Sequence, residues 1–288
     1  LRLCAVFWHA LTLVVFALLA ARIARWRGAL LFGLLWILAP PGLVQLQQFG
    51  WATHLEMCLL AGLALLCLAS AARRGARWRW PLAAAAGALA GGAVSFDFSA
   101  IPVAAGIVLC GIAYSLWRQG RACLALLGGV ALGLLPALLY RLQGRTEHTW
   151  ESAQGRLIPF LLSVGSAYTG FSQPPPVERA WALLSRDLAL STDIAAGAGP
   201  LSMGWLYLAA LSLLATTGVL GLTSARTASA PGRRGALTVI IAASLVVPLY
   251  LIACALSGLQ AESRHLAPLW PFLLLLAASA GGLSLQQG

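Results

Sequence analysis

The sequence predicts an all-α fold: a polytopic integral membrane protein with about nine transmembrane helices and one long extracytoplasmic loop. Hydrophobic residues make up 60% of the 288 residues and charged residues 9%, and the mean hydropathy is +0.85. A soluble domain carries roughly a quarter charged residues, so this chain cannot cover a surface that faces water. Several apolar runs also approach the ~20 residues that a helix needs to cross the hydrocarbon core.

The apolar runs place the spans near residues 3–21, 29–45, 54–72, 81–95, 99–117, 122–140, 201–222, 236–257 and 265–282. The run at 81–95 is short and rich in Gly and Ala, so we expect it to tilt, or to pack between neighbours where small residues permit close approach. The spans divide the chain into an N-terminal transmembrane bundle of about six spans (1–140), an extracytoplasmic loop (141–200) and a C-terminal bundle of about three spans (201–288). The chain begins with Leu1 rather than Met, and we expect an N-terminal piece to be missing.

The basic residues set the orientation of these spans. All 19 are Arg, and the net charge is +11. Most of them lie in short connections without acids: Arg22, Arg25, Arg27, Arg73, Arg74, Arg77, Arg79, Arg118, Arg121, Arg226, Arg233 and Arg234. The positive-inside rule makes these connections cytoplasmic, and alternation places the other connections and the N-terminus outside. We therefore expect a multi-pass protein of a bacterial inner membrane.

The acidic residues then fall on one side. All 8 lie at outer ends or in outer connections: Glu56, Asp97, Glu147, Glu151, Glu178, Asp187, Asp193 and Glu262. The 4 His residues do so as well. The groups capable of chemistry are thus predicted on the extracytoplasmic face.

The long outer loop contains one helical pattern. In VERAWALLSRDLALS (177–191), apolar residues recur at helical spacing and charged residues occupy the other positions. We expect an amphipathic helix near 177–191 that lies at the outer membrane surface or covers a cavity.

The stretch WATHLEMCLLAGLALL (51–66) places His54 and Glu56 at the mouth of an apolar run. Two residues apart on a helix, their side chains point about 200° from each other and do not share a face. In one interpretation they form an interfacial cap, in which Thr53 starts the helix and Glu56 suits the positive end of its dipole. In the other, Glu56 lines a polar cavity just below the outer surface. A carboxylate at membrane depth costs free energy unless it is paired with a positive charge or hydrated.

Asp97 lies between two spans in GGAVSFDFSAIP (91–102), flanked by Phe96 and Phe98. If the turn is at the interface, Asp97 is a solvated residue that caps the next helix together with Ser99. If the turn is sunk into the protein, Asp97 is a buried acid that faces an Arg or a cation. The aromatic neighbours and the short preceding span favour a position of this turn partly inside the protein.

Glu262, Arg264 and His265 stand directly before the final span in AESRHLAPLW (261–270). Arg264 is either an interface anchor or a phosphate ligand, because its planar guanidinium pairs with phosphate and its depth matches that of a lipid headgroup. Tyr140 and Arg141, at the outer end of the sixth span, form a second candidate of the same kind.

Several function classes are disfavoured. The Arg residues are scattered in short loops, which argues against nucleic-acid binding. The sequence has no Walker loop, no HExxH, no GxSxG in triad order and no haem CxxCH motif. The 6 Cys have no metal-like spacing and are expected to be small core residues. Acids in mid-span are typical of ion-coupled transporters, whereas here they cluster at outer ends, which indicates extracytoplasmic surface chemistry.

In this order of spans and motifs, the chain resembles the GT-C glycosyltransferases, in particular the protein-mannosyltransferase and aminoarabinose-transferase branch. The resemblance covers roughly residues 30–282 and rests on WATHLEMCLLAGLALLCLA (51–69), WPLAAAAGALAGGAVSFDFSAIPVAAGIVLC (80–110), GGVALGLLPALLYRLQG (128–144) and SRHLAPLWPFLLLLAA (263–278). It implies a GT-C-like fold and transfer of a sugar from a polyprenyl-phosphate donor on the extracytoplasmic face of the membrane.

The resemblance also implies a mechanism. A carboxylate would act as general base on the acceptor hydroxyl, and Arg and His, with or without a divalent cation, would stabilise the departing lipid phosphate. The family's catalytic acid lies in a loop after the first span, and we find no such loop here, so we expect the chain to be a truncated or a divergent relative. We therefore expect Glu56 and Asp97 to act as substitute catalytic acids. The expected lipid-phosphate or substrate ligands are His54, Tyr140, Arg141, Glu262, Arg264 and His265.

Two other function classes remain open. One is a transporter or flippase for a lipid-linked substrate, and the other is a non-catalytic membrane assembly subunit. The expected partners are a lipid-linked sugar donor and membrane lipid. In the enzyme interpretation, Glu56, Asp97, Arg141 and Arg264 converge on one extracytoplasmic cavity.

Overall fold

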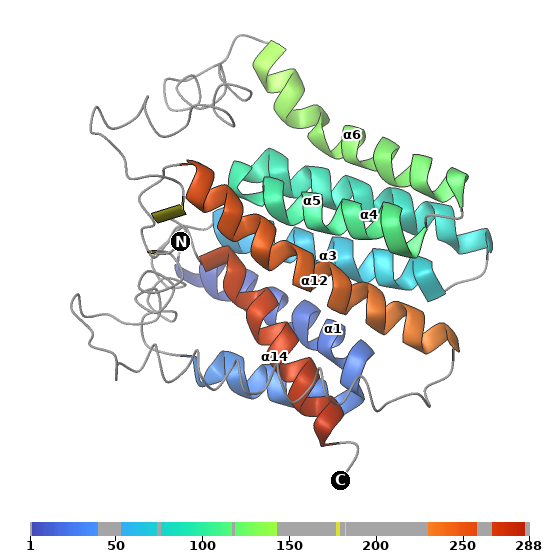
Figure 1. Ribbon diagram of the computed structural model, residues 1–288. Coiled ribbons are helices and arrows are strands. Elements are labelled where there is room, and N and C mark those ends of the chain that lie inside the picture. The colour runs from blue at the N-terminus through green and yellow to red at the C-terminus, as the bar shows by residue number, and fades with distance from the viewer. Residues whose placement is uncertain are drawn as a thin grey trace.

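The computed structural model describes residues 2–39, 53–73, 76–116, 119–142, 177–178, 182, 230–257 and 267–285. Apart from short turns these residues are helical, and no strand occurs among them (Figure 1). The all-α prediction is therefore confirmed for this part of the chain. The longer helices are α1 (Arg2–Ile37), α3 (Thr53–Arg73), α4 (Ala76–Phe96), α5 (Ile101–Cys110), α6 (Gly120–Leu142), α12 (Ala230–Ser257) and α14 (Trp270–Ser284). The short turns are η1 (Phe98–Ala100), η2 (Gly111–Ser115) and η4 (Ala267–Leu269).

A chain reversal divides α1 into two antiparallel halves (Figure 1). At the reversal Arg25 has φ 54° and ψ −149°, outside the helical region. The halves meet along their length: Phe16 stacks on Phe32 with ring centroids 6.0 Å apart, and His9 lies 4.8 Å from Trp36. Pairing of residues before and after the reversal defines a helical hairpin. The run predicted at 3–21 corresponds to the first half, and residues 29–37 of the run predicted at 29–45 correspond to the second half, whereas 40–45 lie outside the described residues.

The other predicted spans can be compared with the helices directly. The runs at 54–72, 81–95, 99–117, 122–140, 236–257 and 265–282 each coincide with a helical segment of similar extent. The run at 201–222 lies outside the described residues. So does the predicted amphipathic helix near 177–191, apart from Val177, Glu178 and Ala182, which are helical. The count of about nine spans stays a prediction.

Several helices suit a membrane. The segments Glu56–Arg73, Gly120–Leu139 and Arg234–Cys254 are long and apolar enough to cross one. Val6–Ile37 is apolar over a still greater length, but the reversal at Arg25 divides it into two halves. Ile101–Tyr114 and Trp270–Ser284 are shorter apolar helices. Large apolar side chains also cover the outer face of α6, where Leu124, Leu127, Leu132, Leu135, Leu138 and Leu139 are exposed. A contiguous apolar face of this kind is unusual on a soluble monomer, and it suits contact with the apolar tails of lipids. The chain is therefore a helical membrane protein.

Glycines bring α4 and α6 into backbone contact. A Cβ added to Gly87 would lie 2.0 Å from the carbonyl oxygen of Leu126, and one added to Gly91 would lie 2.4 Å from that of Val130. The contact moves from Leu126 to Val130 on α6 as the glycine moves from Gly87 to Gly91 on α4. The two helices therefore run parallel. Ser95 continues the four-residue spacing on α4 and donates a 2.7 Å hydrogen bond to the Gly133 carbonyl on α6. The close approach predicted for the run at 81–95 is thus confirmed, and it follows the small-residue rule for membrane helices.

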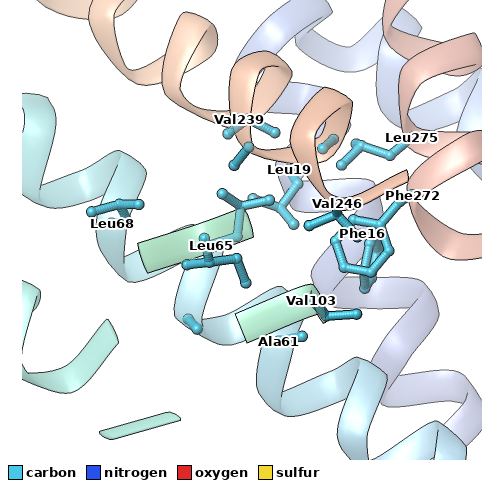
Figure 2. Packing of buried hydrophobic residues seen from close by; sticks show 14 of the residues in the cluster. Phe16, Leu19, Ala61, Leu65, Leu68, Val103, Val239, Val246, Phe272 and Leu275 are labelled. Carbon is cyan, nitrogen blue, oxygen red and sulfur yellow. The ribbon is translucent and has the colours of Figure 1, made fainter. Parts of the chain in front are cut away.

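The centre of the bundle is an apolar core shared by α1, α3, α5, α12 and α14 (Figure 2). Its buried members include Phe16, Leu19, Ala61, Leu65, Leu68, Val103, Val239, Val246, Phe272 and Leu275. Close packing also joins helices that are far apart in sequence. A Cβ on Gly106 of α5 would meet Val246 of α12 at 2.8 Å, and a Cβ on Gly282 of α14 would meet Ala24 of α1 at 2.7 Å. Helices from both ends of the chain therefore share one core.

The bundle has two chemically different ends. Helix α3 runs from Glu56 in its first turn to Arg73 in its last, and α4 runs back from Arg77 toward Asp97. We call these the acid end and the arginine end. The arginine end also contains Arg25, Arg27, Arg79, Arg121 and Arg234, at the turns and termini gathered on one side of Figure 1. Glu56 and Asp97 thus lie at the end opposite these arginines, whereas Arg141, in the last turns of α6, lies at the acid end. The cytoplasmic assignment of the arginine end rests on the positive-inside rule.

Candidate functional site

Asp97 is held in a defined turn at the acid end. Its Oδ1 accepts a 2.9 Å hydrogen bond from the backbone N–H of Ser99, and its carbonyl accepts one of 3.0 Å from Ala100. Its own N–H donates to the carbonyl of Ala93 at 3.0 Å, so the turn continues directly from the end of α4. One carboxylate oxygen thus satisfies a backbone donor of η1, whereas α5 itself has Ala100 at its N-cap without a side-chain hydrogen bond. The choice between a solvated cap and a sunken acid stays open. The side chain of Asp97 is only partly exposed.

The same turn contacts the start of α3. The Ser99 hydroxyl donates to the sulfur of Met57 at 3.6 Å, and Met57 is fully buried. The thiol of the neighbouring Cys58 donates to the carbonyl of Pro268 in η4 at 3.9 Å. Three segments that are distant in sequence therefore meet beside Asp97: the start of α3, the turn between α4 and α5, and the turn that precedes α14.

Tyr250 adds a phenol from a fourth element, α12. Its side chain is 2% exposed and lies within hydrogen-bonding reach of the Ser99 side chain. Asp97, Cys58 and Cys254 lie close enough to interact with it electrostatically. A buried Tyr hydroxyl requires a polar partner, and this group of residues supplies one. We call Asp97, Ser99, Met57, Cys58 and Tyr250 the acid-end cluster.

Glu56 lies on α3 immediately before the two residues that enter the acid-end cluster. Successive helical residues are about 100° apart, so Glu56 points to a different side of α3 than Cys58 does. In agreement with this geometry, Glu56 is partly exposed, whereas Met57 and Cys58 are buried. The centre of the polar contacts is therefore Asp97 rather than Glu56, and Glu56 stands at its edge.

The remaining predicted site residues are placed only in part. His54 belongs to the first turn of α3, and Tyr140 and Arg141 belong to the last turns of α6, but the side chains of these three are outside the described set. Glu262, Arg264 and His265 lie outside the described residues altogether. The structure therefore brings Asp97 to the start of α3, and convergence with Arg141 and Arg264 stays a prediction.

Sequence reasoning missed Tyr250, Ser99 as a side-chain donor, and Met57. A signal for Tyr250 was present, because it is a lone phenol in an otherwise apolar run, SLVVPLYLIAC (244–254). A phenol in such a run needs an internal partner. No comparable signal exists for Met57, which reads as an ordinary core residue. Cys58 was expected to be a small core residue, and it is buried and free.

The chemistry available to the acid-end cluster is that of a carboxylate beside hydroxyl and thiol groups. A carboxylate can accept a proton from a hydroxyl, and a phenol can donate a hydrogen bond to an anion. Among the described residues, no group of three His, Cys, Asp or Glu side chains is arranged to hold a metal ion. The cluster therefore supports proton transfer and hydrogen bonding.

A second polar pair lies inside the α1 hairpin. The Trp36 indole N–H donates to His9 Nε2 at 2.7 Å. Since Nε2 accepts, the imidazole is neutral and carries its proton on Nδ1. Within the described part of the chain, that Nδ1 is buried without a hydrogen-bond partner. The pair links the two halves of the hairpin and is separate from the acid-end cluster.

Comparison with known proteins adds nothing to this geometry, because no protein-family model, curated protein or solved structure matches the chain. The resemblance to GT-C glycosyltransferases accordingly stays a prediction from sequence motifs.

Proposed function

We propose that the chain is a membrane glycosyltransferase-like enzyme that moves a sugar from a polyprenyl-phosphate donor to an acceptor hydroxyl at the acid end. The observation that carries the proposal is the acid-end cluster, in which the Asp97 carboxylate accepts from the Ser99 N–H and the buried Tyr250 phenol interacts with the Ser99 side chain. A polar group inside a membrane bundle is costly unless it is satisfied, and such groups mark functional sites by default.

In this proposal Asp97 is the general base. The acceptor oxygen attacks the anomeric carbon, a new C–O bond forms, and the bond from that carbon to the phosphate oxygen breaks. The acceptor proton passes to the Asp97 carboxylate, and polyprenyl phosphate leaves. The hydrogen bond from the Ser99 N–H fixes the carboxylate, which reduces the cost of orienting the base.

The leaving phosphate needs positive or hydrogen-bonding partners. Tyr250 is one candidate, because its hydroxyl belongs to the cluster. Arg264 is another, since only two residues separate it from Ala267, the first residue of η4, and a few residues of chain span no more than ~3.5 Å each. Arg141 and Tyr140 are candidates of the same kind at the end of α6. Glu56 would orient the acceptor or the sugar at the edge of the cluster.

The test uses the full chain in liposomes with a panel of polyprenyl-phosphate sugars, and the readout is release of free polyprenyl phosphate measured by mass spectrometry. We expect release with the native chain and a loss of about 100-fold or more in D97N, the usual scale for removal of a general base. We expect a smaller loss in Y250F. E178Q is the matched control, because Glu178 is an exposed acid remote in sequence from the cluster.

The other two function classes predict different results. A transporter or flippase would move the labelled lipid across the bilayer without releasing polyprenyl phosphate, and D97N would reduce that movement. An assembly subunit would show neither activity, and D97N would behave like E178Q. Either pattern in a folded protein would contradict the proposed glycosyl transfer.

A further inference from the structure

The arginine end carries a basic surface formed by α3, α4 and α12. Arg73 is the last residue of α3, Arg77 lies in the first turn of α4, and Arg234 lies near the start of α12, and all three are exposed. Within the described bundle helices, the carboxylates of Glu56 and Asp97 lie at the opposite end. No described acid of the bundle therefore balances this positive charge.

Helix packing brings the end of α3 with Arg73 against the start of α12 with Arg234. A Cβ added to Gly235 of α12 would lie 2.4 Å from Cδ of Arg73 and 2.7 Å from its Cγ. The methylene stem of Arg73 thus lies directly against the backbone of α12, beside Arg234. Arg79 Nε donates to the carbonyl of Ala71 at 3.4 Å, which ties the start of α4 to the last turns of α3. The three arginines therefore belong to the ends of packed helices.

Two exposed tryptophans follow Arg77 on α4. Trp78 is 53% exposed and Trp80 is 58% exposed. The guanidinium carbon of Arg77 lies 5.6 Å from the ring centroid of Trp78, within the range of a cation–π contact. Trp is enriched at the depth of lipid headgroups. This placement puts Arg77 at headgroup depth, and stacking on a ring leaves the N–H groups at the guanidinium edge available to donate to phosphate oxygens.

We propose that the basic surface, Arg73, Arg77 and Arg234 with Trp78, binds the phosphate of an anionic phospholipid from the surrounding bilayer. Charge complementarity identifies the ligand, because clustered basic residues next to membrane helices attract anionic headgroups. The acyl chains would lie on exposed apolar helix faces such as that of α6. The proposal concerns the arginine end and does not depend on catalysis at the acid end.

The test measures lipid binding by the full chain purified in a non-ionic detergent. The thermal midpoint is followed while dioleoylphosphatidylglycerol is added, with dioleoylphosphatidylcholine as the zwitterionic comparison. We expect the anionic lipid to raise the midpoint and the zwitterionic lipid to leave it nearly unchanged. Each of R73Q, R77Q and R234Q should weaken binding about fivefold, the factor that corresponds to ~1 kcal/mol per charge. R25Q removes the same charge at the α1 reversal and should weaken binding less than about twofold.

Three results would overturn the proposal. R25Q weakening binding as much as R73Q would show diffuse attraction by the whole arginine end. Equal stabilisation by inorganic phosphate alone would assign the effect to a free anion. Equal stabilisation by both lipids would remove the role of charge. The lipid-bound fraction measured by native mass spectrometry gives the same comparison for any variant whose midpoint in detergent alone has changed.

Discussion

Replacing Gly129 by Ala tests the contact between α4 and α6 with an internal control one residue away. A Cβ at Gly129 would lie 2.1 Å from the carbonyl oxygen of Ala84 and 2.9 Å from the backbone N of Ala88. A Cβ at Gly128 would meet nothing within 4 Å. G129A should therefore force the two helices apart, and G128A should not.

The magnitude follows from the distances. Ordinary van der Waals contact begins at 3.4 Å, so the Gly129 contact is more than 1 Å too short, and its partner is backbone that cannot rotate away. Overpacking of this kind costs about 1–3 kcal/mol. Both variants gain about 0.5–1 kcal/mol because Ala is a better helix former than Gly. The difference in unfolding free energy between G129A and G128A is therefore the overpacking cost, about 1–3 kcal/mol.

Thiol labelling gives a suitable assay in detergent. Cys58 and Cys110 are buried thiols, so a thiol-reactive fluorophore reports their exposure as the protein is heated. The midpoint of G129A should fall several degrees below that of G128A, at about 2–4 °C per kcal/mol for a domain near this size. Equal midpoints would refute the backbone contact. Gly91 and Gly92 offer the same comparison on α4, since a Cβ at Gly91 would lie 2.4 Å from a backbone oxygen and one at Gly92 would meet nothing within 4 Å.

Two further substitutions test separate contacts by the same thermal measurement. W36F removes the donor to His9 Nε2, leaves both imidazole nitrogens without a protein partner, and should cost about 1–3 kcal/mol. G235A places a Cβ against the flexible stem of Arg73 at 2.4 Å and near the Ala69 carbonyl at 3.1 Å. Its cost should stay below about 1 kcal/mol, because the Arg73 stem can move aside.

Each of these has its own control. W26F changes an exposed Trp and should shift stability by no more than about 0.5 kcal/mol; an equal effect of W36F would argue against the hydrogen bond to His9. A loss in G235A as large as that in G129A would show that Arg73 is rigidly held.

Much of the fold could be predicted because membrane helices are recognised in a sequence by the length and apolarity of their runs. The reversal of α1 is one example: the Arg cluster around Arg25 interrupts an apolar run, and the chain turns there. The close approach of α4 was also predictable from its Gly and Ala content. That its partner is α6 was not predictable, because small residues favour a close contact but do not determine which helix makes it.

The candidate site was predicted less completely. Asp97 was identified from its position between two spans, and the structure shows its hydrogen bond from the Ser99 N–H and its partly buried setting. Tyr250 was missed because its role depends on a contact between α12 and the turn at Ser99, more than a hundred residues earlier in the sequence. Helical periodicity within one segment carries no information about such a contact.

The most direct test of the central claim is the distance between Asp97 and the predicted phosphate ligands. Asp97→Cys is paired with Arg264→Cys or Arg141→Cys in a chain freed of its other cysteines, and cross-linked with reagents of graded length. We expect both pairs to be joined by a reagent that spans about 10–12 Å, the reach of two long side chains that meet at one phosphate. If only much longer reagents join them, while a pair at Ser99 and Tyr250 is joined by the shortest, the acid-end cluster stands as a structural feature and the lipid-phosphate site does not.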